Sequence, residues 1–69
     1  MRVDWELLDE RAQRYVEVGD LVSVEAGGAP TLRVMRLDGA RAWVRDERAD
    51  LDMVAPLSQF HWKAHFYPM

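Results

Sequence analysis

The chain has 69 residues, of which 49% are hydrophobic and 30% are charged, so it has room for one small domain of ordinary globular composition. It contains no cysteine, which excludes disulfides, zinc–thiolate sites, iron–sulfur clusters and thiol nucleophiles. Nine basic against twelve acidic residues give a net charge of -3, which disfavours a protein that binds mainly through phosphate contacts.

The first predicted element is an amphipathic α-helix over residues 4–15. Four apolar residues are spaced by three, four and three positions, which places them on one face of a helix. They are Trp5, Leu8, Ala12 and Tyr15. Because an isolated helix of about 12 residues is marginal in water, we expect this face to dock on the rest of the domain or on another chain.

Short β-branched runs separated by turn residues follow this segment and predict five strands. The strands are expected at residues 20–25, 31–37, 40–45, 51–55 and 60–66, with a turn at residues 27–30. Asp38-Gly39 predicts a type I′ hairpin, because both residues tolerate the positive φ that this turn requires. Four charges within residues 46–50 predict an exposed connection, and residues 56–59 suit a single 3₁₀ turn.

The fold that these elements predict is mainly β. Residues 60–66 alternate apolar with polar side chains, and this period of two is typical of a strand. Five short strands with tight turns suit a small, strongly bent barrel better than a sandwich. We therefore predict a small five-stranded SH3-like barrel over residues 17–69, preceded by an N-terminal amphipathic α-helix over residues 1–16, in one domain overall.

The middle of the chain carries a further pattern. Residues 18–34 read Val-Gly-Asp-Leu-Val-Ser-Val-Glu-Ala-Gly-Gly-Ala-Pro-Thr-Leu-Arg-Val, and the Asp38-Gly39 turn and a strand containing Trp43 follow. This Gly-Asp opening, the Gly-Gly-x-Pro-like loop and the strand after it resemble the YodC-like family of small bacterial proteins. The resemblance covers about residues 17–60 and implies a small SH3-like barrel. It implies no established activity, so no catalytic residue is carried over.

Candidate catalytic and metal-binding residues are few. His61 and His65 on one strand would lie about 13 Å apart, at about 3.3 Å per residue, which is too far for one metal ion. The carboxylates within residues 46–52 do not follow a calcium-loop pattern and include Arg48, which favours a solvated loop. Neither Ser23 nor Ser58 lies in a nucleophile motif. We therefore expect no enzyme activity, no metal site and no cofactor.

The third predicted strand carries the most informative surface residues. If Ala42 and Val44 face the core, then Arg41, Trp43 and Arg45 project together from the other side. Tryptophan and arginine dominate the energetics of protein interfaces, so this side is a candidate binding surface. In the alternative interpretation the N-terminal helix covers Trp43 and the arginines extend around it.

Aromatic rings are more numerous than a small barrel can bury. Two or three rings fill such a core, so the others are expected to cover its ends, to bind a partner or to stay exposed. Trp62 and Phe66 in the last predicted strand are therefore further candidate binding residues.

Three functions fit these features. The first is a non-enzymatic protein-interaction module that binds a protein partner or self-associates. Its binding residues are expected to be Arg41, Trp43, Arg45, Trp62 and Phe66. The second is a nucleic-acid or ribonucleoprotein accessory protein that adds Arg33 and Arg36 to the arginines of the third strand, although the net charge disfavours it. The third is a small accessory subunit of a larger complex.

The sequence also disfavours a membrane and a small molecule as partners. No apolar run reaches about 18 residues, so we expect no membrane span, and the acidic N-terminal segment does not resemble a signal peptide. No feature points to a small-molecule substrate. Together with the absence of cysteine, these features favour a cytoplasmic protein.

Overall fold

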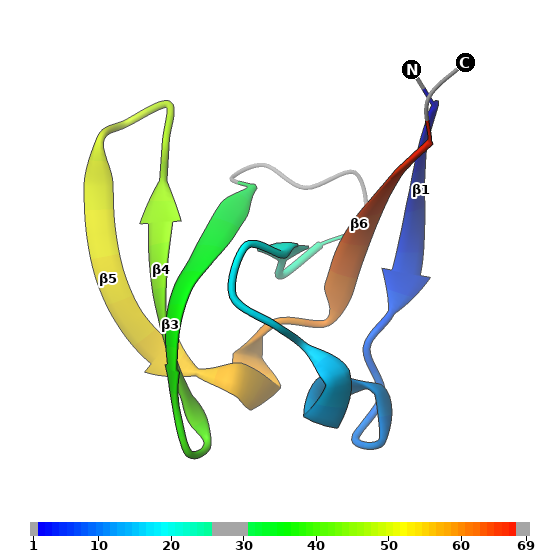
Figure 1. Cartoon of the computed structure of the whole chain (residues 1–69), viewed down its shortest axis with the longest axis horizontal. Helices are drawn as coiled ribbons and strands as arrows, with labels where there is room; N and C mark the ends of the chain where they lie inside the picture. Colours follow the sequence, from blue (N-terminus) through cyan, green and yellow to red (C-terminus); the bar gives the residue numbers. More distant parts are fainter. Residues whose placement is uncertain (1, 26–30, 68–69) are drawn as a thin grey trace.

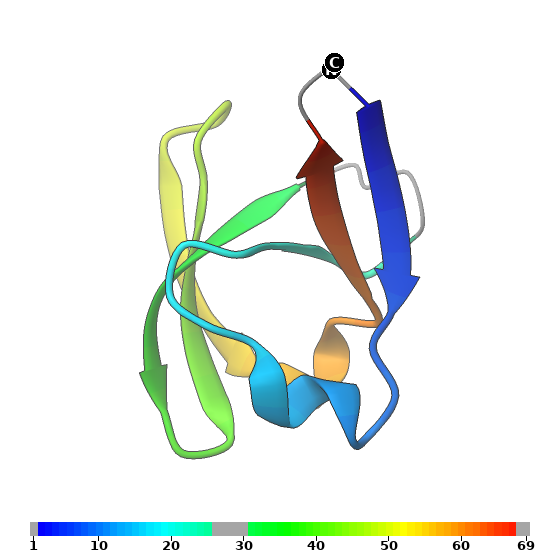
Figure 2. The same cartoon turned by 45° about the vertical axis from the view of Figure 1, so that its right-hand side comes forward.

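The computed structural model describes residues 2–25 and 31–67, which form a six-stranded antiparallel sheet and two 3₁₀ turns. The strands are β1 (Arg2–Leu7), β2 (Leu21–Ser23), β3 (Leu32–Asp38), β4 (Arg41–Asp46), β5 (Leu51–Pro56) and β6 (Trp62–Tyr67), and the turns are η1 (Ala12–Tyr15) and η2 (Leu57–Gln59). The order across the sheet is β1-β6-β2-β3-β4-β5. The sheet curls into a half-barrel, with η1 and η2 near one end (Figure 1, Figure 2). The turn predicted at residues 27–30 lies outside the described residues.

The N-terminal α-helix predicted over residues 4–15 is wrong. Strand β1 occupies this part of the chain and pairs with β6 along its whole length. Its sequence also has a period of two, because Val3, Trp5 and Leu7 alternate with charged residues. Pairing with β6 places these three apolar side chains beside those of Phe66, Ala64 and Trp62. Of the predicted helix only the 3₁₀ turn η1 remains. The sheet therefore has six strands where five were predicted, and none of the described helical segments is long enough to cross a membrane.

The strands predicted after residue 19 are confirmed. The turn of the β3–β4 hairpin differs from the predicted type I′ turn. Asp38 pairs with Arg41, so the loop consists of Gly39 and Ala40. Gly39 has a φ of 58°, whereas neither Asp38 nor Ala40 has a positive φ. These signs match a type II′ turn, which needs a positive φ only at its first central residue. The exposed connection between β4 and β5 and the 3₁₀ turn η2 follow the prediction.

A Gly39→Ala substitution is expected to lower the free energy of unfolding by about 1 kcal/mol, because an L-residue pays a steric cost in the left-handed region. A Cβ at this position meets no atom within 4 Å, so the loss comes from the backbone alone. Chemical denaturation in urea measures it. Gly39→Asn is the control and should lose less, because asparagine tolerates this region. Equal losses in both variants would contradict the explanation.

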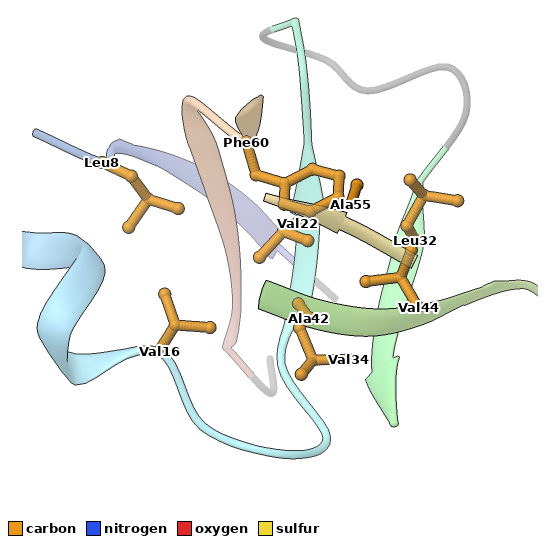
Figure 3. Close-up of a cluster of buried hydrophobic side chains, with 9 residues drawn as sticks. All are labelled: Leu8, Val16, Val22, Leu32, Val34, Ala42, Val44, Ala55 and Phe60. Atoms are coloured by element: carbon orange, nitrogen blue, oxygen red, sulfur yellow. The ribbon is translucent and has the colours of Figure 1, made fainter. Parts of the chain in front are cut away.

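The hydrophobic core lies on the inner side of the curled sheet (Figure 3). It consists of Leu8, Val16, Val22, Leu32, Val34, Ala42, Val44, Ala55 and Phe60, and Ala12, Leu37 and Leu57 pack against it. The chain has seven aromatic rings, from three Trp, two Tyr and two Phe, and Phe60 alone belongs to this cluster. The core is therefore built mostly from aliphatic side chains.

The strand register assigns each side chain of β6 and β1 to one side of the sheet. Val22 is fully buried in the core and pairs with Lys63, so Lys63 is on the core-facing side. Successive side chains alternate, and Trp62 therefore points away from the core, as does its β1 partner Leu7. We call the side turned away from the core the outer face.

Candidate functional site

All five residues predicted to bind a partner lie on the outer face. They are Arg41, Trp43 and Arg45 on β4 and Trp62 and Phe66 on β6. On β4, Ala42 and Val44 are buried in the core, which turns the three residues that alternate with them outward. No described segment covers Trp43, which is 45% exposed, so the alternative in which an N-terminal helix buries this ring is wrong.

The pairing register connects the two groups of residues across the sheet. Leu21 on β2 pairs with Ala64 on one side and with Arg33 on the other. Arg33 in turn pairs with Arg45. One row of the outer face therefore runs from β6 through β2 and β3 to β4, and strand β2 lies between two patches. We call them the Trp43 patch (Met35, Arg36, Arg41, Trp43 and Arg45) and the Trp62 patch (Val3, Trp5, Leu7, Trp62 and Phe66).

A β-bulge in β3 shapes the Trp43 patch. The register shifts between Val34 and Arg36, which inserts Met35 as an extra residue opposite β4. Arg36 then pairs directly with Trp43, and Met35 is 50% exposed beside them. These side chains line a shallow depression of about 440 Å³, together with Val44, Arg45 and Asp52. The lining therefore combines three apolar residues with the charged residues Arg36, Arg45 and Asp52.

The arginines of the outer face differ in their partners. Arg33 forms an ion pair with Glu47 and donates a hydrogen bond of 2.9 Å to the carbonyl of Gly19. Arg45 forms ion pairs with Asp50 and with Asp52, and its Nη1 atom lies 2.8 Å from Asp52 Oδ1. Both guanidinium groups are therefore neutralised within the chain.

Arg36 and Arg41 are the arginines of this surface that lack an ion pair within the part of the chain that the structure describes. Neither forms an ion pair with any of residues 2–25 and 31–67. Asp38 lies opposite Arg41 in the hairpin but makes no ion pair with it in the described structure. Of the four arginines predicted for nucleic-acid binding, Arg36 and Arg41 thus keep a charge without an ion pair among the described residues, and two charges are few for phosphate binding.

The Trp62 patch extends the candidate surface beyond the predicted residues. Val3 pairs with Phe66, and Leu7 pairs with Trp62, so β1 adds its own apolar row to that of β6. Val3, Leu7 and Phe66 are between 40% and 58% exposed. Trp5 lies between them and was missed as a surface residue because it was assigned to a helix. The alternation of Val3, Trp5 and Leu7 in the sequence is the signal that identifies it.

The histidines and the acidic loop make other contacts. His65 lies on the core-facing side with its Nε2 atom 2.6 Å from Glu6 Oε1, whereas His61 is exposed ahead of β6. Asp46 accepts hydrogen bonds from the N–H groups of Arg48 and Ala49, which closes the β4–β5 turn. Within the described ranges, no group of three or more His, Asp or Glu side chains is placed to hold a metal ion.

Comparison of the chain with protein-family models, with curated proteins and with solved structures finds no significant match. The resemblance to the YodC-like family stays a prediction. What the chain does is therefore inferred from its own residues.

Proposed function

We propose that the chain is a small non-enzymatic protein-interaction module whose outer face binds another protein. The observation that carries the proposal is the placement of the aromatic rings. Phe60 alone serves the core, whereas Trp5, Trp43, Trp62 and Phe66 are all on the outer face. Trp43 and Phe66 are 45% and 46% exposed, whereas Trp5 and Trp62 are half-buried. Large apolar side chains that remain in contact with water are typical of a surface that a partner covers. An accessory subunit of a larger complex would use a surface of the same kind.

The chemistry of the Trp43 patch indicates the partner surface that fits it. The depression beside Met35 and Trp43 suits an apolar side chain, and a buried aromatic contact of this kind supplies most of the energy of many interfaces. Arg36 and Arg41 suit carboxylates, which arginine binds through paired hydrogen bonds. We therefore expect the partner to present an apolar anchor flanked by Asp or Glu.

We also propose that the half-barrel is of the SH3-like class. Strands β2 to β6 follow the order β6-β2-β3-β4-β5, with the 3₁₀ turn η2 ahead of the last strand, and this order supports an SH3-like barrel to which β1 is added. Such barrels serve many functions, so this likeness supports the architecture and not a particular partner. A cytoplasmic location fits the cysteine-free composition.

Trp43→Ala is expected to weaken partner binding by about 30-fold, which corresponds to about 2 kcal/mol for a central interface residue. The tagged chain is used to capture its partner from native lysate, and the captured protein is then titrated against each variant. Trp62→Ala reports on the second patch in the same assay. Tyr15→Ala is the matched control, because this ring is 68% exposed but lies on η1, away from the outer face.

Two outcomes would contradict the proposal. One is a partner that binds Trp43→Ala and Trp62→Ala as tightly as it binds the original chain. The other is capture at low salt that nuclease treatment abolishes, because the phosphate contribution is strongest at low salt. That result would favour a nucleic-acid accessory protein instead.

A further inference from the structure

Strand β5 is a free edge of the sheet that residues 2–25 and 31–67 form, and the register shows which of its peptide groups have no strand partner among these residues. Leu57 donates its N–H to the carbonyl of Ala40 at 2.8 Å, so Pro56 and its partner Arg41 form a non-hydrogen-bonded pair. Such pairs alternate with hydrogen-bonded ones along an antiparallel ladder. The N–H and C=O groups of Asp52 and Val54 therefore point away from β4, toward the free edge.

The side chains of this edge are unusually apolar for an unprotected strand. Val54 on the outer face is 43% exposed, and Leu51 and Met53 on the core-facing side are 53% and 37% exposed. Asp52 is the strand's one charged residue, and Pro56 stands at its end. Natural edge strands avoid pairing by placing charges, bulges or prolines along the edge.

The other free edge carries such protection. On β1, Arg2, Asp4 and Glu6 occupy every second position, and their side chains share the core-facing side with Lys63. A strand added beside β1 would have to accommodate these charges. Edge pairing is therefore favoured at β5 over β1.

We propose that β5 pairs antiparallel with β5 of a second copy of this chain, with Met53 on the two-fold axis. In this register Asp52 of each copy exchanges backbone hydrogen bonds with Val54 of the other, which uses the peptide groups that point to the free edge. The two Met53 side chains face each other, and Leu51 faces Ala55 of the second copy.

The neighbouring registers are less favourable. A shift in one direction places Asp52 opposite Asp52 of the second copy, and like charges directly opposite each other destabilise a sheet. A shift in the other direction places Pro56, which has no N–H, opposite Asp52. Charge and hydrogen bonding therefore select the Met53-centred register.

Because the chain contains no cysteine, Met53→Cys provides a specific test. The Cα atoms of a non-hydrogen-bonded pair lie about 4.5 Å apart, within the range of about 4.4–6.8 Å for disulfides. Mild oxidation should therefore give a covalent dimer of twice the 8.0 kDa chain mass. Val54→Cys, a diagonal pair about 7–8 Å apart, and Val3→Cys on β1 should cross-link at least about tenfold more slowly. Equal rates in the three variants, or faster linking of Val54→Cys, would overturn the proposal.

Met53→Lys tests the same contact without a cross-link, because it places two ammonium groups against each other across the axis. Analytical ultracentrifugation should give a dimer for the original chain and a monomer for this variant, with the same circular dichroism spectrum. Val3→Lys is the control at the other edge, with a residue of similar exposure, and should remain dimeric. A monomeric original chain at millimolar concentration would overturn the proposal. The dimer does not depend on the proposed function, since Trp43→Ala should weaken partner binding and leave the dimer intact.

Discussion

Phe60→Ala is expected to lower the free energy of unfolding by several kcal/mol. Phe60 is 1% exposed and is the aromatic ring of the core cluster, and truncation of a buried phenylalanine costs about 3–5 kcal/mol. A chain of 69 residues has about 3–10 kcal/mol of stability in total, at about 0.05–0.15 kcal/mol per residue. The variant therefore loses a large part of the free energy that holds the half-barrel. Circular dichroism during urea unfolding measures the loss.

Phe66→Ala is the matched control, because it removes the same atoms from the outer face. Phe66 is 46% exposed and does not belong to the core cluster, so its truncation should cost less than about 1 kcal/mol. Similar losses for both variants would mean that the Trp62 patch is structural rather than available to a partner. A large loss for Phe60→Ala alone would support the division of the rings between core and outer face.

The N-terminal segment shows why part of the fold could not be predicted from the sequence. Its residues satisfy two periods at once, a helical spacing from Trp5 to Tyr15 and an alternation from Val3 to Leu7. In the structure Leu8 enters the core, Trp5 is on the outer face and Tyr15 is exposed, so the predicted helical face does not exist. The choice depends on pairing with β6, a contact with the other end of the chain that no local pattern contains.

The hairpin region was predictable because its signals are local. Alternation on β4 placed Trp43 between Arg41 and Arg45, and the structure confirms that these side chains share one face. The neutralisation of Arg45 was not predictable, because it needs the β4–β5 turn to bring Asp50 back beside it. The charge that the surface offers is set by the folded turn and not by the composition of the strand.

The faces to which Phe60 and Trp62 point could not be predicted either. Its alternation suggests that Phe60 and Trp62 share one face, yet Phe60 is in the core and Trp62 is on the outer face. His61 donates its N–H to the carbonyl of Ser23, which is one position out of register with the pairing of Ser23 and Trp62. This irregularity changes the face that the following residues present. A one-residue shift in strand pairing cannot be recognised from the alternation of apolar and polar residues.

A second large effect is expected from Asp20→Ala, at about 2 kcal/mol of unfolding free energy. Asp20 Oδ2 lies 3.1 Å from Lys63 Nζ and accepts the N–H of Glu17 at 2.8 Å. Both ion-pair side chains are about one fifth exposed, at 19% for Lys63 and 21% for Asp20. Loss of one partner from a fully buried pair costs about 3–5 kcal/mol, and the remaining access to water lowers this figure. Thermal and urea unfolding measure the change.

The physical cause can be separated with two further variants. Asp20→Asn keeps an oxygen that accepts the N–H of Glu17 and removes only the charge, so it isolates the ion pair from the turn. Lys63→Met in the Asp20→Ala background removes the ammonium left without a partner and should recover about 1 kcal/mol. If the double variant is no more stable than Asp20→Ala, the lysine reaches water when its partner is lost. The stabilisation would then come from the turn that leads into β2 and not from the charge pair on the core-facing side of β6.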